Sequence, residues 1–243
     1  MPKVIDSYGD VEYVSHMGTD LTVVNAARVS FNKQSEWAVD TAAQERLQTS
    51  GSVYREEDLQ VLSSKDARLI GYLARHNHWT PFAHPQITLR IKAPIFVRTQ
   101  LFKHKVGFTE NEVSRRYCTD APQFYTPEWR MAPTDGAKQG SSGFATDPIL
   151  HGDWDRLYNK SALEAVEIYN LLLEEGVAPE QARAVLPQGV YTEWWWTGSL
   201  SAYARVCRLR GDAHAQWEVQ QYAAAISGII APLFPASWKA LTV

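Results

Sequence analysis

The chain has few cysteines for its length. Cys118 and Cys207 are the only two among 243 residues, and they form no C-x-x-C pair. A disulfide scaffold and thiol redox chemistry are therefore not expected, and two isolated cysteines are typical of a reducing compartment. We expect the protein to be cytoplasmic.

Long apolar runs are also missing. No segment approaches the roughly 20 apolar residues that a helix needs to cross a bilayer. The first residues, MPKVIDSYGDVEYV, contain no apolar core of a signal peptide. We therefore expect no membrane partner.

An excess of positive charge is absent too. The 24 Lys and Arg are outnumbered by 27 Asp and Glu, which gives a formal net charge of -3. A nucleic-acid partner is therefore not expected, and any basic site must be local and suited to a small anion. Hydrophobic residues make up 45% of the chain, enough for a substantial core. Without an internal repeat or a convincing boundary, residues 1–243 are predicted to form one domain.

Hydrophobic periodicity predicts both helices and strands. The segment 87–93, ITLRIKA, alternates apolar and polar residues and is predicted to be a strand with one buried face; 189–196 is a second candidate strand. Helices are expected at 20–31 with Asp20 as a possible cap, 64–77, 95–105, 153–175, from 179, within 197–211, and finally at 212–231 with Asp212 as its first residue.

Residues 119–152 are dense in Pro, Gly, Ser and Asp, so a long surface excursion is expected there. Its aromatic residues Phe124, Tyr125 and Trp129 should attach it to the body of the protein. In the run Trp194 to Trp196, strand alternation should bury two indoles and expose one.

The most informative stretch is 100–117, QLFKHKVGFTENEVSRRY. Two cationic clusters flank a short turn that carries an amide and a hydroxyl, as a pocket for a phosphorylated ligand requires. Residues 113–117 are predicted to be extended, with Ser114 and Arg116 on one face. Ser114 is interpreted as a phosphate-binding hydroxyl rather than a nucleophile, because no Ser-His-Asp order activates it. By residue type alone, the arginines could equally pair with nearby carboxylates on the surface.

Two other groups invite a functional interpretation. The histidines at 76, 78 and 84 have no carboxylate partner in their spacing, so no metal site is expected. Cys118 is interpreted as a small packed residue rather than as a nucleophile.

Five blocks of sequence occur in an order that matches a known family. They are HWTPF (78–82), KAPIFV (92–97), QLFKHK with NEVSRRY (100–105 and 111–117), ARAVLP (182–187) and LRGDAHAQWEVQQYA (209–223). Together they resemble the flavin-dependent thymidylate synthases from about residue 20 to about residue 230. The family's signature is commonly Arg-His-Arg, seven residues, then Ser. Here Lys103 and Lys105 replace the arginines and eight residues precede Ser114. Lysine keeps the charge but lacks the planar fork of arginine.

The resemblance implies a mixed α+β fold, with a small sheet flanked by helices, that assembles as a homotetramer with sites shared between subunits. It implies the reductive methylation of dUMP to dTMP. In that reaction 5,10-methylenetetrahydrofolate gives the carbon, NADPH reduces FAD, and the reduced flavin supplies the hydride.

Residue roles follow from the same resemblance. The implied dUMP contacts are Gln100, Leu101, Phe102, Lys103, Glu112, Val113, Ser114, Arg115, Arg116, Arg183 and Arg210. The implied flavin contacts are Ser30, Thr80, Lys103, His104, Lys105, Glu112, Ser199, Leu200, Ser201 and Arg205. His78 is implied to lie beside the flavin and the folate, and Arg210 to stabilise charge on the pyrimidine. His214 and Gln216 could line the site or only pack at a helix start.

Two alternatives remain open from the sequence. In one, the basic clusters bind a nucleic-acid backbone, which the net charge of -3 disfavours. In the other, the protein keeps the fold and the flavin but has lost methyl transfer, because Lys103 and Lys105 replace the two arginines.

Overall fold

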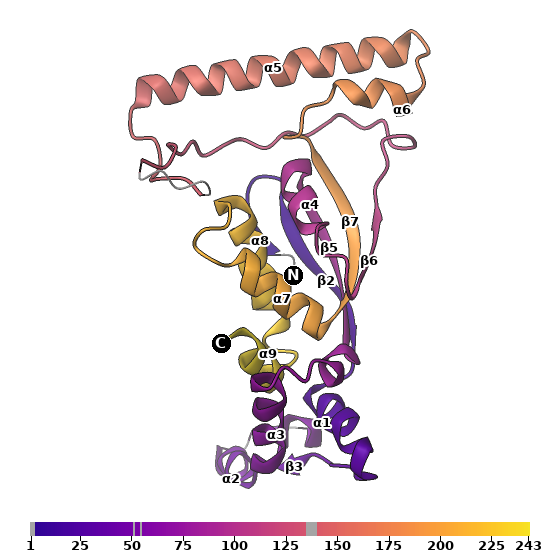
Figure 1. Ribbon diagram of the computed structural model, residues 1–243, viewed down its shortest axis with the longest axis vertical. Helices are drawn as coiled ribbons and strands as arrows, with labels where there is room; N and C mark the ends of the chain where they lie inside the picture. Colours follow the sequence, from indigo (N-terminus) through magenta and orange to yellow (C-terminus); the bar gives the residue numbers. More distant parts are fainter. Residues whose placement is uncertain (1–2, 51, 54, 135–139) are drawn as a thin grey trace.

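A computed structural model describes residues 3–50, 52–53, 55–134 and 140–243 (Figure 1). In the described part of the chain, a five-stranded antiparallel sheet has the order β1-β2-β5-β7-β6. Its strands are β1 (Lys3–Val4), β2 (Asp10–Met17), β5 (Gln86–Pro94), β6 (Phe108–Glu112) and β7 (Tyr191–Ser199). The expected mixed α+β fold with a small sheet is confirmed.

The central strands pack as their alternating sequences predict. Ile87, Leu89 and Ile91 of β5 are completely buried, and their polar neighbours face the other way. In β7, Trp194 and Trp196 are buried while Trp195 is 53% exposed, which confirms the predicted alternation. The β5–β7 pair therefore contributes buried side chains to the core from the inner strands of the sheet.

Helices cover one face of the sheet, and a further group of helices lies beyond its lower end (Figure 1). Next to the sheet lie α7 (Leu200–Arg210) and α8 (Trp217–Ile230), and α9 (Pro235–Thr242) packs against α7 and against a helix of the lower end. At the lower end lie α1 (Asp20–Arg28), η1 (Val29–Phe31), α2 (Thr41–Ser50), η2 (Glu56–Leu59), α3 (Ser64–Arg75), η3 (Thr80–Ala83) and the small β3–β4 ladder (Ala38–Val39 with Gln60–Val61). One core cluster joins residues of α1, α3, β5, β7, α7, α8 and α9.

The opposite end carries α4 (Ile95–Leu101), α5 (Pro148–Glu174), α6 (Pro179–Ala182) and η4 (Arg183–Val185). α5 is the outermost element there (Figure 1). Asp147 caps it by accepting hydrogen bonds from the backbone N–H groups of Ile149 and Leu150. The irregular segment therefore ends at residue 147, earlier than expected.

Several expected elements differ from the structure. The helix predicted for 95–105 ends at Leu101. Residues 113–117 are not an extended strand: the strand is Phe108–Glu112, and the chain then turns, with the N–H groups of Tyr117 and Cys118 donating to the Ser114 carbonyl at 3.0 and 3.1 Å. The last predicted helix begins at Trp217, because Asp212 accepts hydrogen bonds from His214 in a turn.

Asp20 is not the cap of its own helix. Thr19 occupies that position, and the buried Asp20 carboxylate accepts hydrogen bonds from the N–H groups of Ala236 and Ser237 at 2.8 and 2.9 Å. These two N–H groups lie in the first turn of α9, a helix that the sequence reading missed.

Candidate functional site

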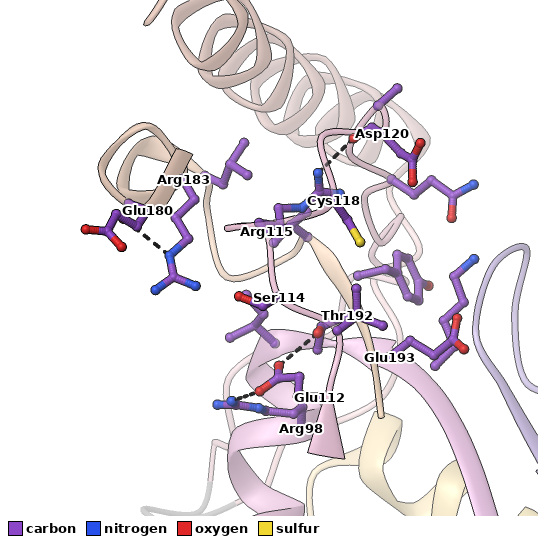
Figure 2. Close-up of a pocket in the computed structure, with 18 of the residues that line it drawn as sticks. Arg98, Glu112, Ser114, Arg115, Cys118, Asp120, Glu180, Arg183, Thr192 and Glu193 are labelled. Atoms are coloured by element: carbon purple, nitrogen blue, oxygen red, sulfur yellow. Dashed lines mark hydrogen bonds and ion pairs between the residues drawn. The ribbon is translucent and has the colours of Figure 1, made fainter. Parts of the chain in front are cut away.

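A cavity of about 640 Å³ lies at the α6 end of the sheet (Figure 2). One wall is the chain as it leaves β6, with Glu112, Ser114 and Arg115; the opposite wall is α6 and η4, with Arg183. In Figure 2 the Arg183 side chain points toward Ser114. This volume lies within the range of small-ligand sites.

Two of the cavity's arginines keep donors available. Arg115 donates to the carbonyl of Asp120 at 2.8 Å, and Arg183 donates to the carbonyl of Glu180 at 3.3 Å. Neither forms an ion pair with a carboxylate in the part of the chain that the structure describes. A guanidinium with free N–H groups beside a hydroxyl is well suited to an anion such as a phosphate.

A third arginine of the cavity, Arg98 on α4, was missed by the sequence reading. It pairs with Glu112, which also accepts a hydrogen bond from the Thr192 hydroxyl at 2.8 Å. The guanidinium lies over the Phe102 ring, 4.4 Å from its centroid. Its partner is 14 residues away across a turn, so no local spacing could have revealed the pair.

Two sequence expectations differ from the structure at this cavity. Arg116 does not share an extended face with Ser114: it forms an ion pair at 2.7 Å with Glu180, which lines the cavity, and about half of each side chain is exposed. This is the surface pairing that the sequence left open for the arginines. The contact of Arg116 with dUMP stays a prediction. Cys118 is not packed but exposed, and it lines the cavity, because the turn after Ser114 carries it outward.

A second group of predicted residues meets between α4 and α7. Arg210 donates to Nε2 of His104 at 3.0 Å and to the carbonyl of Gln100 at 3.2 Å. Arg205 donates to the carbonyl of Val106 at 2.5 Å. Burial, and to a smaller extent the charges of Arg210 and Arg205, together lower the pKa of His104 to about 4. His104 is therefore neutral at pH 7, with Nε2 as an acceptor.

The lysines of this stretch lie at the surface. Lys105 pairs with Glu110 and lies over the Phe102 ring, while Lys103 forms no ion pair with any described residue. Leu101 is completely buried in the core, so its side chain is not available to a ligand. The Phe102 ring packs edge-on against Trp194.

The third group lies at the lower end of the sheet. His78, Thr80 and Ser30 are exposed around η3 and η1. Close by, the N-terminus of α7 begins where the Leu200 N–H donates to the Pro85 carbonyl at 3.0 Å.

The start of α7 is closely packed. Ser199 caps the helix, and its hydroxyl is 3.1 Å from that of Ser201. The Leu200 side chain is completely buried, so only its backbone can face a ligand. Gly107 has φ +83°, and a Cβ there would lie 2.9 Å from the Cβ of Ala202. Only glycine lets the loop after α4 approach α7 this closely.

The first and third groups lie at opposite ends of the same strand pair. Pro94 pairs with Tyr191 at the cavity end, and Gln86 pairs with Ser199 at the other end. Eight residue steps along a strand correspond to roughly 26 Å. One copy of the chain therefore does not bring Arg183 next to Thr80.

Comparison with known proteins identifies the family and the fold. The sequence profile of the family described as thymidylate synthase complementing protein matches residues 12–236. The chain belongs to this family. Curated relatives are the flavin-dependent thymidylate synthases of Thermotoga neapolitana, 35% identical over 96% of this chain and 90% of the relative, and of Thermus thermophilus, 37% identical over 96% and 75%.

A solved structure of similar fold is the UMP/dUMP methylase PolB from Streptomyces cacaoi bound with 5-Br dUMP. It superposes with a TM-score of 0.75 at 29% identity, covering 96% of this chain and 94% of PolB. The flavin-dependent thymidylate synthase resemblance seen in the sequence is thus confirmed.

Two further features of the described residues bear on function. No helix among them is both long and apolar enough to cross a membrane. Within the same part of the chain, no three His, Cys, Asp or Glu side chains come together as metal ligands.

Proposed function

We propose that this chain catalyses the reductive methylation of dUMP to dTMP, with FAD as its flavin, NADPH as reductant and 5,10-methylenetetrahydrofolate as carbon donor. The observation that carries the proposal is the cavity in which Ser114, Arg115 and Arg183 present donors, with neither arginine in an ion pair with a described carboxylate. Family membership and the names of the curated relatives support it.

The nucleotide's phosphate is assigned to this cavity. Arg183 and Arg115 supply charged N–H donors and Ser114 a hydroxyl, a combination that binds a phosphate dianion strongly. Glu112 and Val113 form the adjoining wall. Arg116 takes part only if it exchanges its ion pair with Glu180 for the phosphate.

The pyrimidine is assigned to the group around Arg210, with Gln100, Lys103 and Phe102 nearby. C5 of uracil becomes nucleophilic only as negative charge develops on the ring. A fixed guanidinium stabilises that charge in the transition state. Neutral His104 holds the Arg210 guanidinium by accepting from its Nε, so this arginine is oriented before the substrate binds.

The residues of the second and third groups fit a flavin dinucleotide. Lys103, Lys105 and Arg205 are cations that offset a diphosphate or an anionic ring, and Ser30, Thr80 and Ser201 supply hydroxyls. The buried Ser199 hydroxyl caps α7, so Ser199 and Leu200 would contact the flavin through their backbone. When bound, FAD supplies the hydride chemistry. His78 is exposed beside Thr80, where it can contact both the flavin and the folate.

These groups meet only if several copies of the chain combine, so we propose a homotetramer with sites shared between subunits. The separation along β5 and β7 supports this arrangement. So do six exposed apolar residues of α5: Ile149, Leu150, Leu157, Leu163, Ile168 and Leu171. We place the enzyme in the cytoplasm, because its two cysteines are unpaired in the structure.

PolB is named a UMP/dUMP methylase, so UMP is a second candidate substrate. Steady-state turnover of dUMP and UMP, compared as kcat/KM on one preparation, distinguishes the two.

Two measurements test the proposal. Purified protein should bind FAD with the characteristic flavin absorbance, and it should release tritium from C5-labelled dUMP when 5,10-methylenetetrahydrofolate and NADPH are present. Failure to bind FAD even with dUMP added would contradict the proposed enzyme. FAD binding without tritium release would instead indicate a flavoprotein that has lost methyl transfer. Salt-sensitive binding of polyanions in place of dUMP would support the nucleic-acid alternative.

A further inference from the structure

A buried ion pair joins the irregular segment before α5 to the start of α8. Arg130 donates to both carboxylate oxygens of Glu218 at 2.7 Å, and the Tyr125 hydroxyl donates to Oε1 of Glu218 at 3.1 Å. The two charged side chains are only 13% and 8% exposed. Burial by itself would raise the pKa of Glu218, but hydrogen bonds from Arg130 and Gln216 bring the pKa below its ordinary value.

Two glutamines extend this pair to the group around Arg210. Nε2 of Gln216 donates to Oε2 of Glu218 at 2.9 Å, and Oε1 of Gln216 accepts from Nε2 of Gln100 at 2.6 Å. The Gln100 amide also donates to the Phe96 carbonyl at 3.4 Å. Both N–H groups of Gln100 are thus in use, and its Oε1 accepts no hydrogen bond from any described residue.

The orientation of the Gln216 and Gln100 side-chain amides has a physical cause. A side-chain amide presents either its oxygen or its NH₂ group after a half-turn, so its neighbours decide which one faces a ligand. An ionised carboxylate only accepts hydrogen bonds, so Glu218 forces Gln216 to turn its NH₂ group inward. Gln216 then offers its oxygen to Gln100, and Gln100 must donate to it.

We propose that Glu218, held in place by Arg130, is a positioning residue that fixes the Gln100 amide with its carbonyl oxygen toward the nucleotide. The site then selects a nucleotide that presents a hydrogen-bond donor at this point. The inference rests on the proposed role of Gln100 at dUMP. In dUMP the neutral donors are N3–H of the base and the 3′-hydroxyl.

The test compares dissociation constants on the FAD-loaded protein. The ligands are dUMP, N3-methyl-dUMP and 3′-deoxy-dUMP, each of the last two lacking one donor. The variant Glu218→Gln keeps the size of the side chain but can present its own NH₂ group to Gln216, which allows both amides to turn over. The variant Gln216→Met breaks the hydrogen-bonded connection and leaves the Arg130–Glu218 ion pair intact, so it is the second test should Glu218→Gln fail to fold.

Wild-type protein should bind one of the two analogues at least roughly 5-fold more weakly than dUMP, because one hydrogen bond is lost. In Glu218→Gln and Gln216→Met, dUMP should bind roughly 5- to 10-fold more weakly than in the wild type. The penalty, which is the dissociation constant of that analogue divided by that of dUMP, should shrink to about 2-fold or less in both variants. Tyr125→Phe is the matched control: it removes a hydrogen bond to Oε1 of the same carboxylate but leaves the Gln216 bond to Oε2, so the penalty should stay at the wild-type value.

The outcomes distinguish a failure of the proposed function from a failure of the proposed role of Glu218. Wild-type protein that binds FAD but no dUMP contradicts the proposed function itself. If the wild type binds dUMP, and the ratio of each analogue's dissociation constant to that of dUMP is the same in the wild type and all variants, the inference is overturned. Loss of the penalty in Tyr125→Phe as well overturns it too, because the ion pair would then act only by holding the fold.

Discussion

At the residue scale, substitutions of Arg210 and Ser114 are expected to change different kinetic parameters. Arg210→Ala removes a fixed cation from developing charge, so turnover at saturating dUMP should fall by roughly 10²–10³-fold. Ser114→Ala removes one phosphate donor, so KM for dUMP should rise by roughly 10-fold with little change in kcat. Tritium release over a range of dUMP concentrations checks both. Complete loss of the chemical step in the serine variant at saturating dUMP would overturn this assignment.

His104 gives a prediction for pH. Its pKa falls from the ordinary 6.5 to about 4 in the folded protein, because it is buried beside Arg210 and Arg205. Between these two values the unfolded chain binds a proton that the folded chain does not, so this residue's contribution to stability is present above pH 6.5 and is lost as the pH falls toward 4.

The check is urea unfolding of the wild type and of His104→Gln from pH 7.5 to 4. The difference in unfolding free energy between them should change in favour of the glutamine variant as the pH falls. A difference that does not vary over this range would contradict the lowered pKa.

At the element scale, α9 depends on a carboxylate from the other end of the chain. Asp20→Ala leaves the N–H groups of Ala236 and the buried Ser237 without acceptors, so the free energy of unfolding should fall by about 2 kcal/mol. Asp147→Ala is the comparison, because it removes an exposed cap from α5 and should cost about 1 kcal/mol or less. Equal losses in urea unfolding would show that burial of Asp20 adds nothing.

The elements that the sequence predicted are those whose signal is local. β5 alternates strictly, and its inward residues are all buried. β2 was missed because it buries only Val11 among its eight residues, so it shows no alternation to detect. α9 was missed because its N-terminal acceptor, Asp20, lies 216 residues before the group it binds.

In the candidate site, too, the sequence predicts only what local signals reveal. Ser114, Arg115 and Arg183 were named from sequence blocks and do line one cavity. Arg116 was assigned a direction by assuming a strand, and the turn at 115–117 instead brings it to Glu180. Arg98 and Arg130 gave no signal, because their partners Glu112 and Glu218 are distant in the chain.

At the scale of the whole molecule, α5 predicts assembly. Its exposed leucines and isoleucines fall on the side opposite the buried Ala162 and Tyr169, so the helix has two apolar faces and the single chain covers one. The double variant Leu157→Gln with Leu163→Gln should lower the assembly mass in sedimentation. Turnover should fall with it at low protein concentration, where the assembly dissociates.

Met17→Gln, a similar change at an exposed apolar residue of β2, is the control and should leave the mass unchanged. A wild-type mass equal to one chain, with full turnover, would contradict shared sites.

The bond from Asp20 to α9 also has a consequence for biosynthesis. Ala236 and Ser237 leave the ribosome 216 and 217 residues after Asp20. Until α9 has emerged, the Asp20 carboxylate lacks the two N–H groups that donate to it in the folded protein, and the apolar surface that Trp238 later covers stays open to solvent. Chains that end before α9 should therefore expose this surface and be cleaved by proteases more readily than chains that contain α9.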